Sequence, residues 1–229
     1  MGGGGLDNQL IQGEHIRSNY LIQNLRGDTI DTWISWRLPQ DEILHINIVN
    51  AEKYPGKIDS IKDTIFSMET IEIDDSLLHK GPAGQSSTYY QGWKGALNSL
   101  DQQTVFYIPK KIEISTVSDG SGDIIITLTD LKSPDGFSGF TKSLVDENEH
   151  QILKSQITIY EADRLSVEQL KTILRHEFGH ALGLAHSTAP EDLMYPTITT
   201  NYPYISECDI DGIKALYNGE QASYVLCQK

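Results

Sequence analysis

Residues 176–186 read HEFGHALGLAH, and the interpretation of the whole 229-residue chain depends on this stretch. His176 and His180 stand four residues apart, so on a helix they share one face, with about 6 Å between their Cβ atoms. Both imidazoles can therefore reach one metal ion. His186 cannot follow on the same helix, because it would point about 120° away from His180 and lie about 9 Å further along. A sharp turn at Gly183, where glycine has no steric cost, would bring His186 back.

Three imidazoles that converge on one ion leave the fourth position of a tetrahedral site open, which is typical of a catalytic rather than a structural zinc. Glu177 directly follows the first histidine, so its carboxylate can hold a zinc-activated water and take its proton. Zinc lowers the pKa of such a water towards about 7 and polarises a bound carbonyl. The stretch predicts one catalytic zinc held by His176, His180 and His186, with Glu177 as the general base.

The stretch closes the best-marked helix in the sequence, residues 167–182. Ser166, followed three residues later by Gln169, predicts a capping box at the start of this helix. Gly183 follows at the position where a helix commonly ends in a left-handed residue. We therefore expect an active-site helix that ends just before the third histidine.

The rest of the chain mixes two patterns. Alternating apolar residues and β-branched runs indicate strands, and apolar residues three or four apart indicate helices. This mixture predicts an α/β domain around a mixed, twisted sheet. A segment with two glycines, 136–141, is expected to form a short edge strand. The predicted strands cover 44–49, 105–115, 123–128 and 156–160, and the other predicted helices cover 57–67, 90–100 and 207–217.

Composition and charge limit the partners of the chain. The net charge of −14, from 18 Lys+Arg against 32 Asp+Glu, disfavours nucleic acid as a partner. No stretch approaches the ~20 apolar residues of a membrane span, and we expect a monomer. Residues 1–5 are interpreted as a cloning remnant, and no signal peptide is recognised. Residues 6–32 are polar and weakly patterned, which favours an N-terminal arm over the domain surface, with a turn at 26–28.

Beyond the histidines, the sequence resembles a known peptidase clan. Residues 176–186 resemble the H-E-x-x-H-x-x-G-x-x-H signature of the metzincins. Residues 192–196, DLMYP, resemble their Met-turn, in which Met194 would form an apolar floor under the zinc. Ser187, after the third histidine, and DIDGIKALY at 209–217 are similar to the matrixins in particular. The close likeness covers about residues 166–218.

This resemblance implies a zincin-like α+β catalytic domain at 33–229. Its upper subdomain, 33–183, would hold a five-stranded twisted sheet with helices. A small C-terminal subdomain, 184–229, would lie below the active-site cleft.

The resemblance also implies where a substrate would bind. An extended peptide would run antiparallel to an edge strand, for which Gly139, Phe140 and Thr141 are the candidates. Residues 196–204 would wall the pocket for the residue after the scissile bond. Pro196, Tyr202 and Tyr204 are the candidates there, and the alternative role of the tyrosines is packing within the lower subdomain.

The sequence also departs from the family pattern. No Pro-Arg-Cys-Gly latency segment is present, and no cysteine precedes Cys208, which excludes a cysteine switch within this chain. The remaining histidines lack the spacing of a second zinc site and are interpreted as structural or surface residues. Calcium is left open, since no calcium motif is recognised. The histidines outside the predicted zinc site are His15, His45, His79 and His150.

Cys208 and Cys227 are predicted to form a disulfide. Cys208 falls in the first turn of the helix 207–217, which is about 16 Å long. The tail from 218 to 227 spans up to about 33 Å if extended, so it can fold back to that turn. The bond would contribute roughly 3 kcal/mol and indicate an oxidising, extracellular or secreted setting. The alternative is two buried free thiols.

The function favoured by these observations is a zinc-dependent endopeptidase that hydrolyses peptide bonds in extended protein or peptide substrates. One alternative is a non-catalytic zinc-binding module on the same fold. Another is a peptidase restricted to one partner or to short peptides.

Overall fold

Buried β-branched side chains mark the strands at the centre of a twisted mixed sheet. Ile46, Ile126 and Ile157 are at most 1% exposed, and each lies on a strand with a neighbour on both sides. Such side chains pack well on a pleated, buried surface. The computed structural model describes residues 16–227. Its helices and strands, in chain order, are β1 (Ile16–Asn24), β2 (Thr29–Ile30), β3 (Ser35–Trp36), β4 (Leu44–Val49), α2 (Ile58–Phe66), β5 (Thr70–Asp74), β6 (Ser86–Tyr90), α3 (Trp93–Asn98), β7 (Ile112–Ser115), β8 (Ile124–Leu128), β9 (Gly139–Asp146), β10 (Gln151–Ile159), α4 (Val167–Ala181), β11 (Thr197–Ile198) and α5 (Glu207–Tyr217), with short 3-10 turns at Ala51–Lys53, Pro55–Lys57 and Asp75–Leu78.

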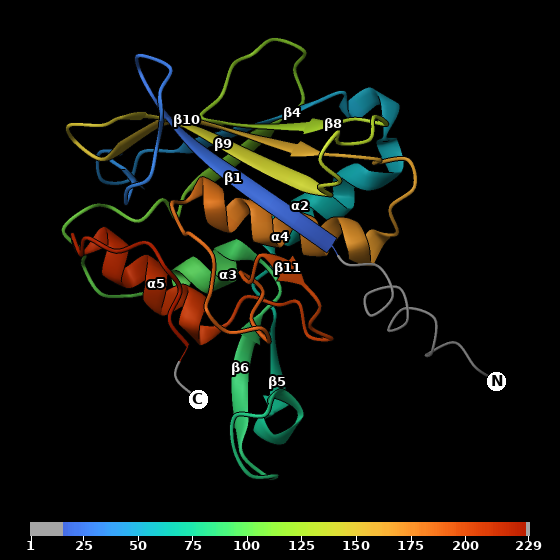
Figure 1. Cartoon of the computed structure of the whole chain (residues 1–229), viewed down its shortest axis with the longest axis vertical. Coiled ribbons are helices and arrows are strands. Elements are labelled where there is room, and N and C mark those ends of the chain that lie inside the picture. The colour runs from blue at the N-terminus through green and yellow to red at the C-terminus, as the bar shows by residue number, and fades with distance from the viewer. Residues whose placement is uncertain (1–15, 228–229) are drawn as a thin grey trace.

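The sheet runs in the order β7-β4-β8-β10-β9-β1-β11 (Figure 1). β7, β4, β8 and β10 are mutually parallel, whereas β9 is antiparallel to β10. The short strands β2 and β3 pair with β1 and β10. The mixed α/β sheet is thus confirmed. The five strands from β7 to β9 correspond to the predicted five-stranded sheet, which β1 then extends.

The prediction of a short edge strand at 136–141 was wrong. β9 runs over eight residues from Gly139, and it pairs with β10 on one side and with β1 on the other. Every second residue of β9 is buried. The backbone of this strand is therefore paired along both sides, so it is not an edge.

The prediction of a surface arm was also wrong for residues 16–24. These residues form β1, which pairs parallel with β9 from Ser18↔Gly139 to Asn24↔Val145. Ile16, Ser18 and Ile22 are buried on one side of the strand. Residues 1–5, and the part of the predicted arm that precedes residue 16, lie outside the described residues.

Most of the other predicted elements are present, with shifted ends. The strands at 44–49, 123–128 and 156–160 appear in β4, β8 and β10, and the helices at 57–67, 90–100 and 207–217 appear as α2, α3 and α5. The predicted strand 105–115 is reduced to Ile112–Ser115. Pro109 has no N–H to give to a ladder, and before it the Phe106 amide donates to the Tyr217 carbonyl of α5 at 2.8 Å instead of to a strand.

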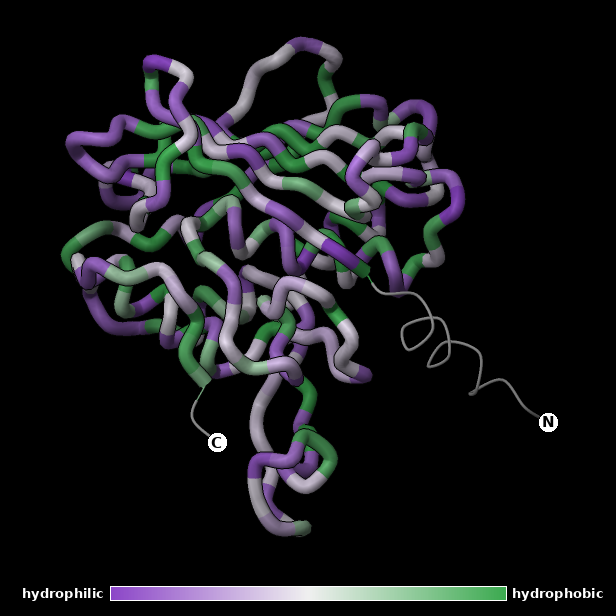
Figure 2. Tube along the Cα trace, viewed as in Figure 1, coloured by the Kyte–Doolittle hydropathy of each residue, from purple (hydrophilic) through white to green (hydrophobic). Residues whose placement is uncertain are grey.

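Helix α4 lies under the sheet and carries the histidine stretch (Figure 1). The predicted capping box is present: Ser166 Oγ accepts from the Gln169 amide at 3.1 Å, and Gln169 Oε1 accepts from the Ser166 amide at 3.0 Å. Figure 2 shows apolar residues gathered in the strands above α4 and hydrophilic residues in the outer loops. The helix is thus fixed at its start by its cap and along its length by the sheet.

The lower part of the molecule contains more of the chain than predicted. β5 and β6 form a separate hairpin that projects downwards (Figure 1). Tyr90, at the end of β6, pairs with Ile205 of the C-terminal segment. The hairpin therefore belongs with the lower part, although the division at 183/184 had placed it in the upper subdomain.

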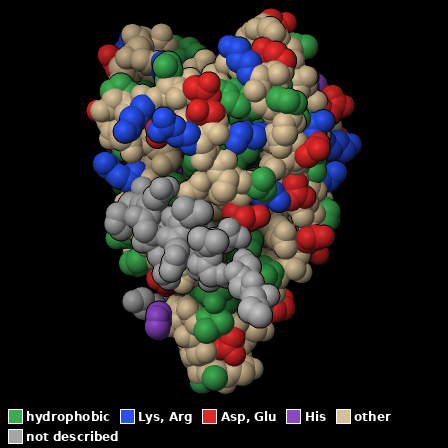
Figure 3. All heavy atoms as spheres, turned by 90° about the vertical axis from the view of Figure 1, so that its right-hand side faces the viewer, with side chains coloured by type: hydrophobic (Ala, Val, Ile, Leu, Met, Phe, Trp, Pro, Cys, Tyr) green, Lys and Arg blue, Asp and Glu red, His purple; other side chains and the backbone are tan. Residues whose placement is uncertain are grey.

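Within residues 16–227, none of the helices combines the length and the apolar character that crossing a membrane requires. Acidic and basic side chains are interspersed over the face shown in Figure 3. The net charge of −14 is thus not gathered into a single acidic patch on that face.

Candidate metal centre

Helix α4 presents His176 and His180 from consecutive turns, and backbone carbonyls fix both rings. The Nδ1–H of His176 donates to the carbonyl of Leu193 at 2.7 Å, and that of His180 donates to the carbonyl of Leu184 at 2.7 Å. A carbonyl can only accept, so each ring carries its proton on Nδ1 and leaves the Nε2 lone pair free. The two Nε2 atoms lie 3.0 Å apart. Both lone pairs therefore face one point.

His186 reaches the same point through a reversal of the chain at Gly183, as predicted from the spacing. Gly183 has φ +112°, and a Cβ on it would lie 2.2 Å from the carbonyl oxygen of Ile34. Only glycine fits such a left-handed position pressed against backbone. The Nε2 of His186 is buried and has no hydrogen-bond partner. A buried ring nitrogen without a hydrogen-bond partner is suited to bind a metal ion.

The donor set fits zinc. One ring nitrogen from each of His176, His180 and His186 lies within 4.8 Å of the others. Two nitrogens bound to a tetrahedral zinc at 2.0–2.1 Å would be separated by about 3.3 Å, close to the observed spacing of the first pair. Among residues 16–227, this is the one histidine cluster of that kind.

Burial keeps the three imidazoles neutral, which is the state that binds a metal. It lowers the pKa of His176 to about 3 and that of His186 to about 4. The pKa of His180 is held well below its usual value by burial and by the two neighbouring rings.

Met194 lies directly against the helix that carries the ligands. A Cβ on Gly179 would come within 2.7 Å of the Met194 Sδ, so the thioether fills the space that a side chain would take there. The loop around Met194 is held by its own backbone, since its amide donates to Asp192 Oδ2 at 2.9 Å and its carbonyl accepts from the Ser187 amide at 2.8 Å. This packing agrees with an apolar floor at Met194.

Glu177 is completely buried and held by two hydroxyl groups. Thr141 Oγ1 donates to Oε2 at 2.7 Å, and Ser18 Oγ donates to Oε1. Burial raises the pKa of Glu177 to about 8, and the two hydroxyl donors oppose that rise. The carboxylate thus has a fixed orientation beside the first histidine.

The sequence pattern did not point to Ser18 or Tyr20, because 6–32 was interpreted as an arm. The ring of Tyr20 stacks on His180 with centroids 4.4 Å apart and meets His186 edge-on at 5.0 Å. Burial raises the pKa of Tyr20 to about 12. The signal that could have revealed this strand is the period of two in Ile16, Tyr20 and Ile22, which the polar Ser18 interrupts.

The residues predicted to bind substrate are found in two different settings. Gly139, Phe140 and Thr141 lie on β9 beside β1. Pro196 also contacts β1, since its carbonyl accepts from the Ser18 amide at 3.3 Å. Tyr202 and Tyr204 lie against the apolar cluster of the β5–β6 hairpin, and Tyr204 faces the guanidinium of Arg175 at 5.0 Å.

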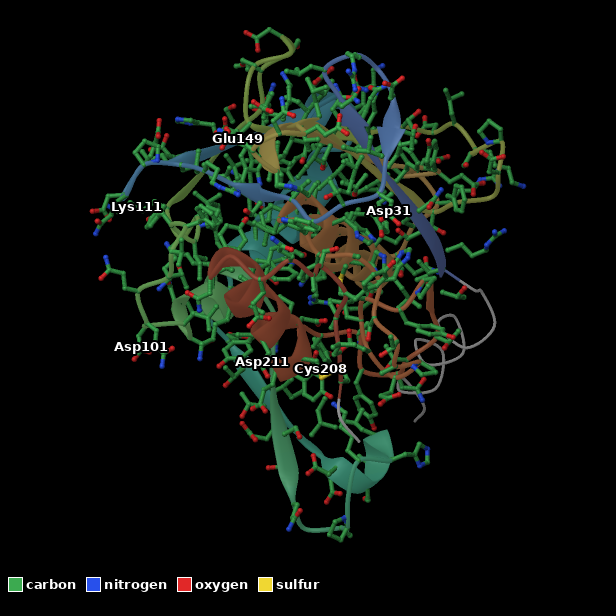
Figure 4. All side chains as sticks on the ribbon, turned by 60° about the vertical axis from the view of Figure 1, so that its left-hand side comes forward. Asp31, Asp101, Lys111, Glu149, Cys208 and Asp211 are labelled. Atoms are coloured by element: carbon green, nitrogen blue, oxygen red, sulfur yellow. A yellow bond between two sulfur atoms is a disulfide. The ribbon has the colours of Figure 1, made fainter. Side chains whose placement is uncertain are left out.

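Cys208 and Cys227 are joined by a disulfide, with their Cα atoms 5.2 Å apart. Cys208 lies in the first turn of α5 (Figure 4). The C-terminal tail is held there by its backbone too, because Val225 pairs with Ser187 directly after the third histidine. The disulfide thus ties the tail to α5, and the backbone pairing holds the same tail against the loop that follows the metal ligands.

The other described histidines lie outside the site. His45 is exposed beside Glu113, and His150 stacks on Trp33. His79 ends the 3-10 turn Asp75–Leu78 in a left-handed conformation. His15 lies outside the described residues.

Comparison with known proteins agrees with this geometry. A family model described as Matrixin matches residues 82–218, more than half of the chain. Matrix metalloproteinase-20 of Homo sapiens is 57% identical over 51 residues, which cover 21% of this chain and 11% of that protein. Metalloendoproteinase 1 of Glycine max is 29% identical over 136 residues, 56% of this chain and 43% of that protein. The matches thus span less than half the length of either relative.

The family match includes α4, the turn at Gly183, all three histidines and the loop of Met194. The histidines converge as a zinc site requires, and the sheet above them has the mixed order expected for this fold. The chain belongs to the matrixin family of zinc-dependent endopeptidases.

Proposed function

We propose that this chain hydrolyses internal peptide bonds of extended polypeptides, with one zinc held by His176, His180 and His186. The observation that carries the proposal is the convergence of three neutral imidazoles next to the buried carboxyl of Glu177. Three protein ligands leave room for water and substrate, which a structural zinc site would not.

Zinc bound there would polarise the scissile carbonyl and lower the pKa of a water molecule. Glu177 takes the proton of the attacking water and delivers it to the nitrogen of the leaving amine. The hydroxyl of Thr141 holds Oε2 of that carboxyl at 2.7 Å and the hydroxyl of Ser18 holds Oε1, so the water would take the place of the Ser18 hydroxyl at Oε1. Met194 closes the space behind the helix and keeps the histidines in place.

The substrate is proposed to bind along β9 in the place that β1 occupies in this structure. Gly139, Phe140 and Thr141 offer their backbone on the side where β1 lies, and the carbonyl of Pro196 accepts from across the groove. That an extended segment of the chain itself already pairs there supports this mode of binding.

We further propose that the protein works outside the cell or in an equivalent oxidising space. The disulfide between Cys208 and Cys227 supports this setting, because such bonds persist where glutathione does not reduce them.

Two measurements test the proposal. Metal analysis should give about one zinc per chain. His186→Ala should lose this zinc, because only two of the three imidazole ligands remain. Two tightly held zincs per chain would contradict the single site. A peptide library should then be cleaved by the zinc-loaded chain. Retained zinc without cleavage would favour the non-catalytic module, and cleavage of only a few short peptides would favour a restricted peptidase.

A further inference from the structure

The C-terminal tail, residues 223–227, runs alongside the loop that carries the third histidine of the metal centre. Before that histidine, the Ala185 amide donates to the Ser223 carbonyl at 2.9 Å. After it, the Thr188 amide donates to the Val225 carbonyl at 3.3 Å. The loop is therefore paired with the tail on both sides of its metal ligand.

Val225 lies at the centre of this pairing. Its amide donates to the carbonyl of His186 at 3.4 Å, so the tail also holds the ligand residue itself. The Val225 side chain is completely buried beside α5, where a Cβ on Gly212 would lie 3.7 Å from Val225 Cγ2. The tail thus fills the space between the ligand loop and the last helix.

The third ligand depends on its backbone more than the other two do. The rings of His176 and His180 are fixed by hydrogen bonds to backbone carbonyls. Within residues 16–227, no hydrogen bond reaches the ring of His186. The place of this ring at the centre is therefore set by ring packing and by the backbone of its own loop, which the tail supports.

The disulfide between Cys208 and Cys227 fastens the end of the tail to the first turn of α5 (Figure 4). Both cysteines are partly exposed. Cys208 borders a cavity of about 470 Å³ that the exposed residues Glu207 and Leu226 also line. A small reductant can therefore reach the bond from solvent.

Little else in the tail holds it to the molecule. Tyr224 is 55% and Leu226 70% exposed, and of residues 223–227 only Val225 is buried. A short segment with one buried side chain and a few backbone hydrogen bonds opens locally at a low cost. The disulfide is thus what keeps the pairing closed.

We infer that the tail is a positioning element of the metal centre and that the disulfide is the reversible bond that holds it in place. A dithiol that reduces Cys208–Cys227 frees the tail, loosens the loop of His186 and weakens the hold on zinc. One thiolate of the dithiol attacks a sulfur of the bond and forms a mixed disulfide; its second thiol closes a cyclic disulfide, and both cysteines become thiols. This inference rests on the proposed function, because it concerns the zinc which that function requires.

The experiment compares the full, zinc-loaded chain in an oxidised and an opened form. The opened form is reduced with a dithiol, alkylated at both cysteines and freed of reagents, so that no added thiol competes for zinc. The oxidised form passes through the same alkylation without the reduction. The double variant Cys208→Ser and Cys227→Ser gives an opened form without any reagent. Zinc release to a coloured chelator and residue-resolved amide hydrogen exchange are measured for each.

Opening should speed zinc release by about 10- to 100-fold, the range in which metal affinity falls when a group that orients a ligand is lost. The amides of Ala185 and Thr188 should exchange faster, because their acceptors belong to the tail. The Ser187 amide is the internal control, since it donates to the Met194 carbonyl at 2.8 Å and not to the tail. Its exchange should change far less.

Ile112→Ala controls for a general loss of stability. Ile112 is buried on β7, at the edge of the sheet opposite to β11. Its truncation leaves a cavity in the core and should lower the free energy of unfolding. Zinc release and the exchange of the Ala185 amide should stay as in the parent protein.

Val225→Pro tests the pairing while the disulfide is kept, because proline removes the amide that donates to His186. It should speed zinc release. Leu226→Pro is the matched control, at an exposed position whose amide donates no backbone hydrogen bond within residues 16–227. It should not speed zinc release, and mass measurement confirms that both variants keep the disulfide.

Faster exchange at Ala185 and Thr188 with unchanged zinc release would overturn the inference, because the tail would then support the fold alone. Equal acceleration of zinc release in Ile112→Ala would also overturn it, because the effect would then be general. The proposed function fails separately. An oxidised chain that holds zinc but cleaves no peptide would refute the peptidase, while the zinc-release rates of the two forms would still decide the role of the tail.

Discussion

Thr141 Oγ1 donates a 2.7 Å hydrogen bond to Oε2 of Glu177 and lies 3.2 Å from the Glu177 carbonyl oxygen, so a residue of β9 fixes the carboxyl that α4 supplies. This hydroxyl group is one of the points at which the sheet contacts the active-site helix. This contact fixes the position of α4, which carries Glu177, relative to β9, along which the substrate is proposed to bind.

We expect Thr141→Val to lower kcat by about 10- to 100-fold, because a hydrogen bond to a charged group contributes about 1.5–3 kcal/mol. KM should change little, since the hydroxyl orients the base rather than the substrate. Thr141→Ser, which keeps the hydroxyl, should retain most of kcat. Steady-state kinetics separate these cases, and an equal loss in both variants would argue against an orienting role.

Gly183→Ala should destabilise the fold strongly. Its Cβ would lie 2.2 Å from the Ile34 carbonyl oxygen and 2.9 Å from Leu216 Cδ2, at a φ of +112°. We expect a loss of about 3 kcal/mol or more in the free energy of unfolding, measured with urea. Gly84→Ala is the control, because Gly84 also has a positive φ of +93° but no heavy atom within 4 Å of the added Cβ. It should cost about 1 kcal/mol, and equal losses in the two variants would remove the steric explanation.

Replacing both cysteines by Cys208→Ser and Cys227→Ser should lower the free energy of unfolding by about 3 kcal/mol, as expected for a closed loop of about 20 residues. A reductant should cause a similar loss in the parent protein and none in the double variant. Mass measurement after alkylation checks the bond itself. Two alkylatable thiols in the unreduced, unfolded protein would contradict it.

Asp209 should make the fold less stable as the pH rises. Burial, with the carboxyl of Asp192 opposite it, holds the pKa of Asp209 well above its usual value. Above the unfolded pKa of about 3.9 the unfolded chain releases this proton while the native chain keeps it, so stability falls by up to ~1.4 kcal/mol per pH unit until the folded pKa is reached.

Asp209→Asn provides the comparison. It keeps an oxygen that can accept from the Ser206 amide, as Asp209 Oδ2 does at 3.0 Å, but it removes the proton equilibrium. Urea unfolding at a series of pH values above 4 should show a shallower decline in this variant. Parallel curves for the two proteins would show that Asp209 is not the source.

The metal centre could be predicted from the sequence because its signals are local. The capping box at Ser166, the four-residue spacing of His176 and His180, and the glycine before His186 are all read within about twenty residues. The chain reversal at Gly183 needs no knowledge of distant segments, although Ile34 is what makes glycine obligatory there.

The wrong predictions concern contacts between distant parts of the chain. Whether β9 is an edge depends on a strand more than a hundred residues earlier, and β1 was misread because Ser18 and Asn24 are polar residues at buried positions. Ser18 is buried because it finds Glu177, a partner 159 positions away. The local pattern of polar and apolar residues cannot reveal a partner so distant in the sequence.

The most direct test of the account is kcat for Glu177→Gln in the zinc-loaded chain, measured beside the zinc-loaded parent protein. With about one zinc per chain and an unchanged unfolding curve, we predict a loss of at least about 100-fold in kcat with little change in KM, because the general base is removed while the site remains. Turnover equal to that of the parent, with zinc bound, would contradict the proposed mechanism.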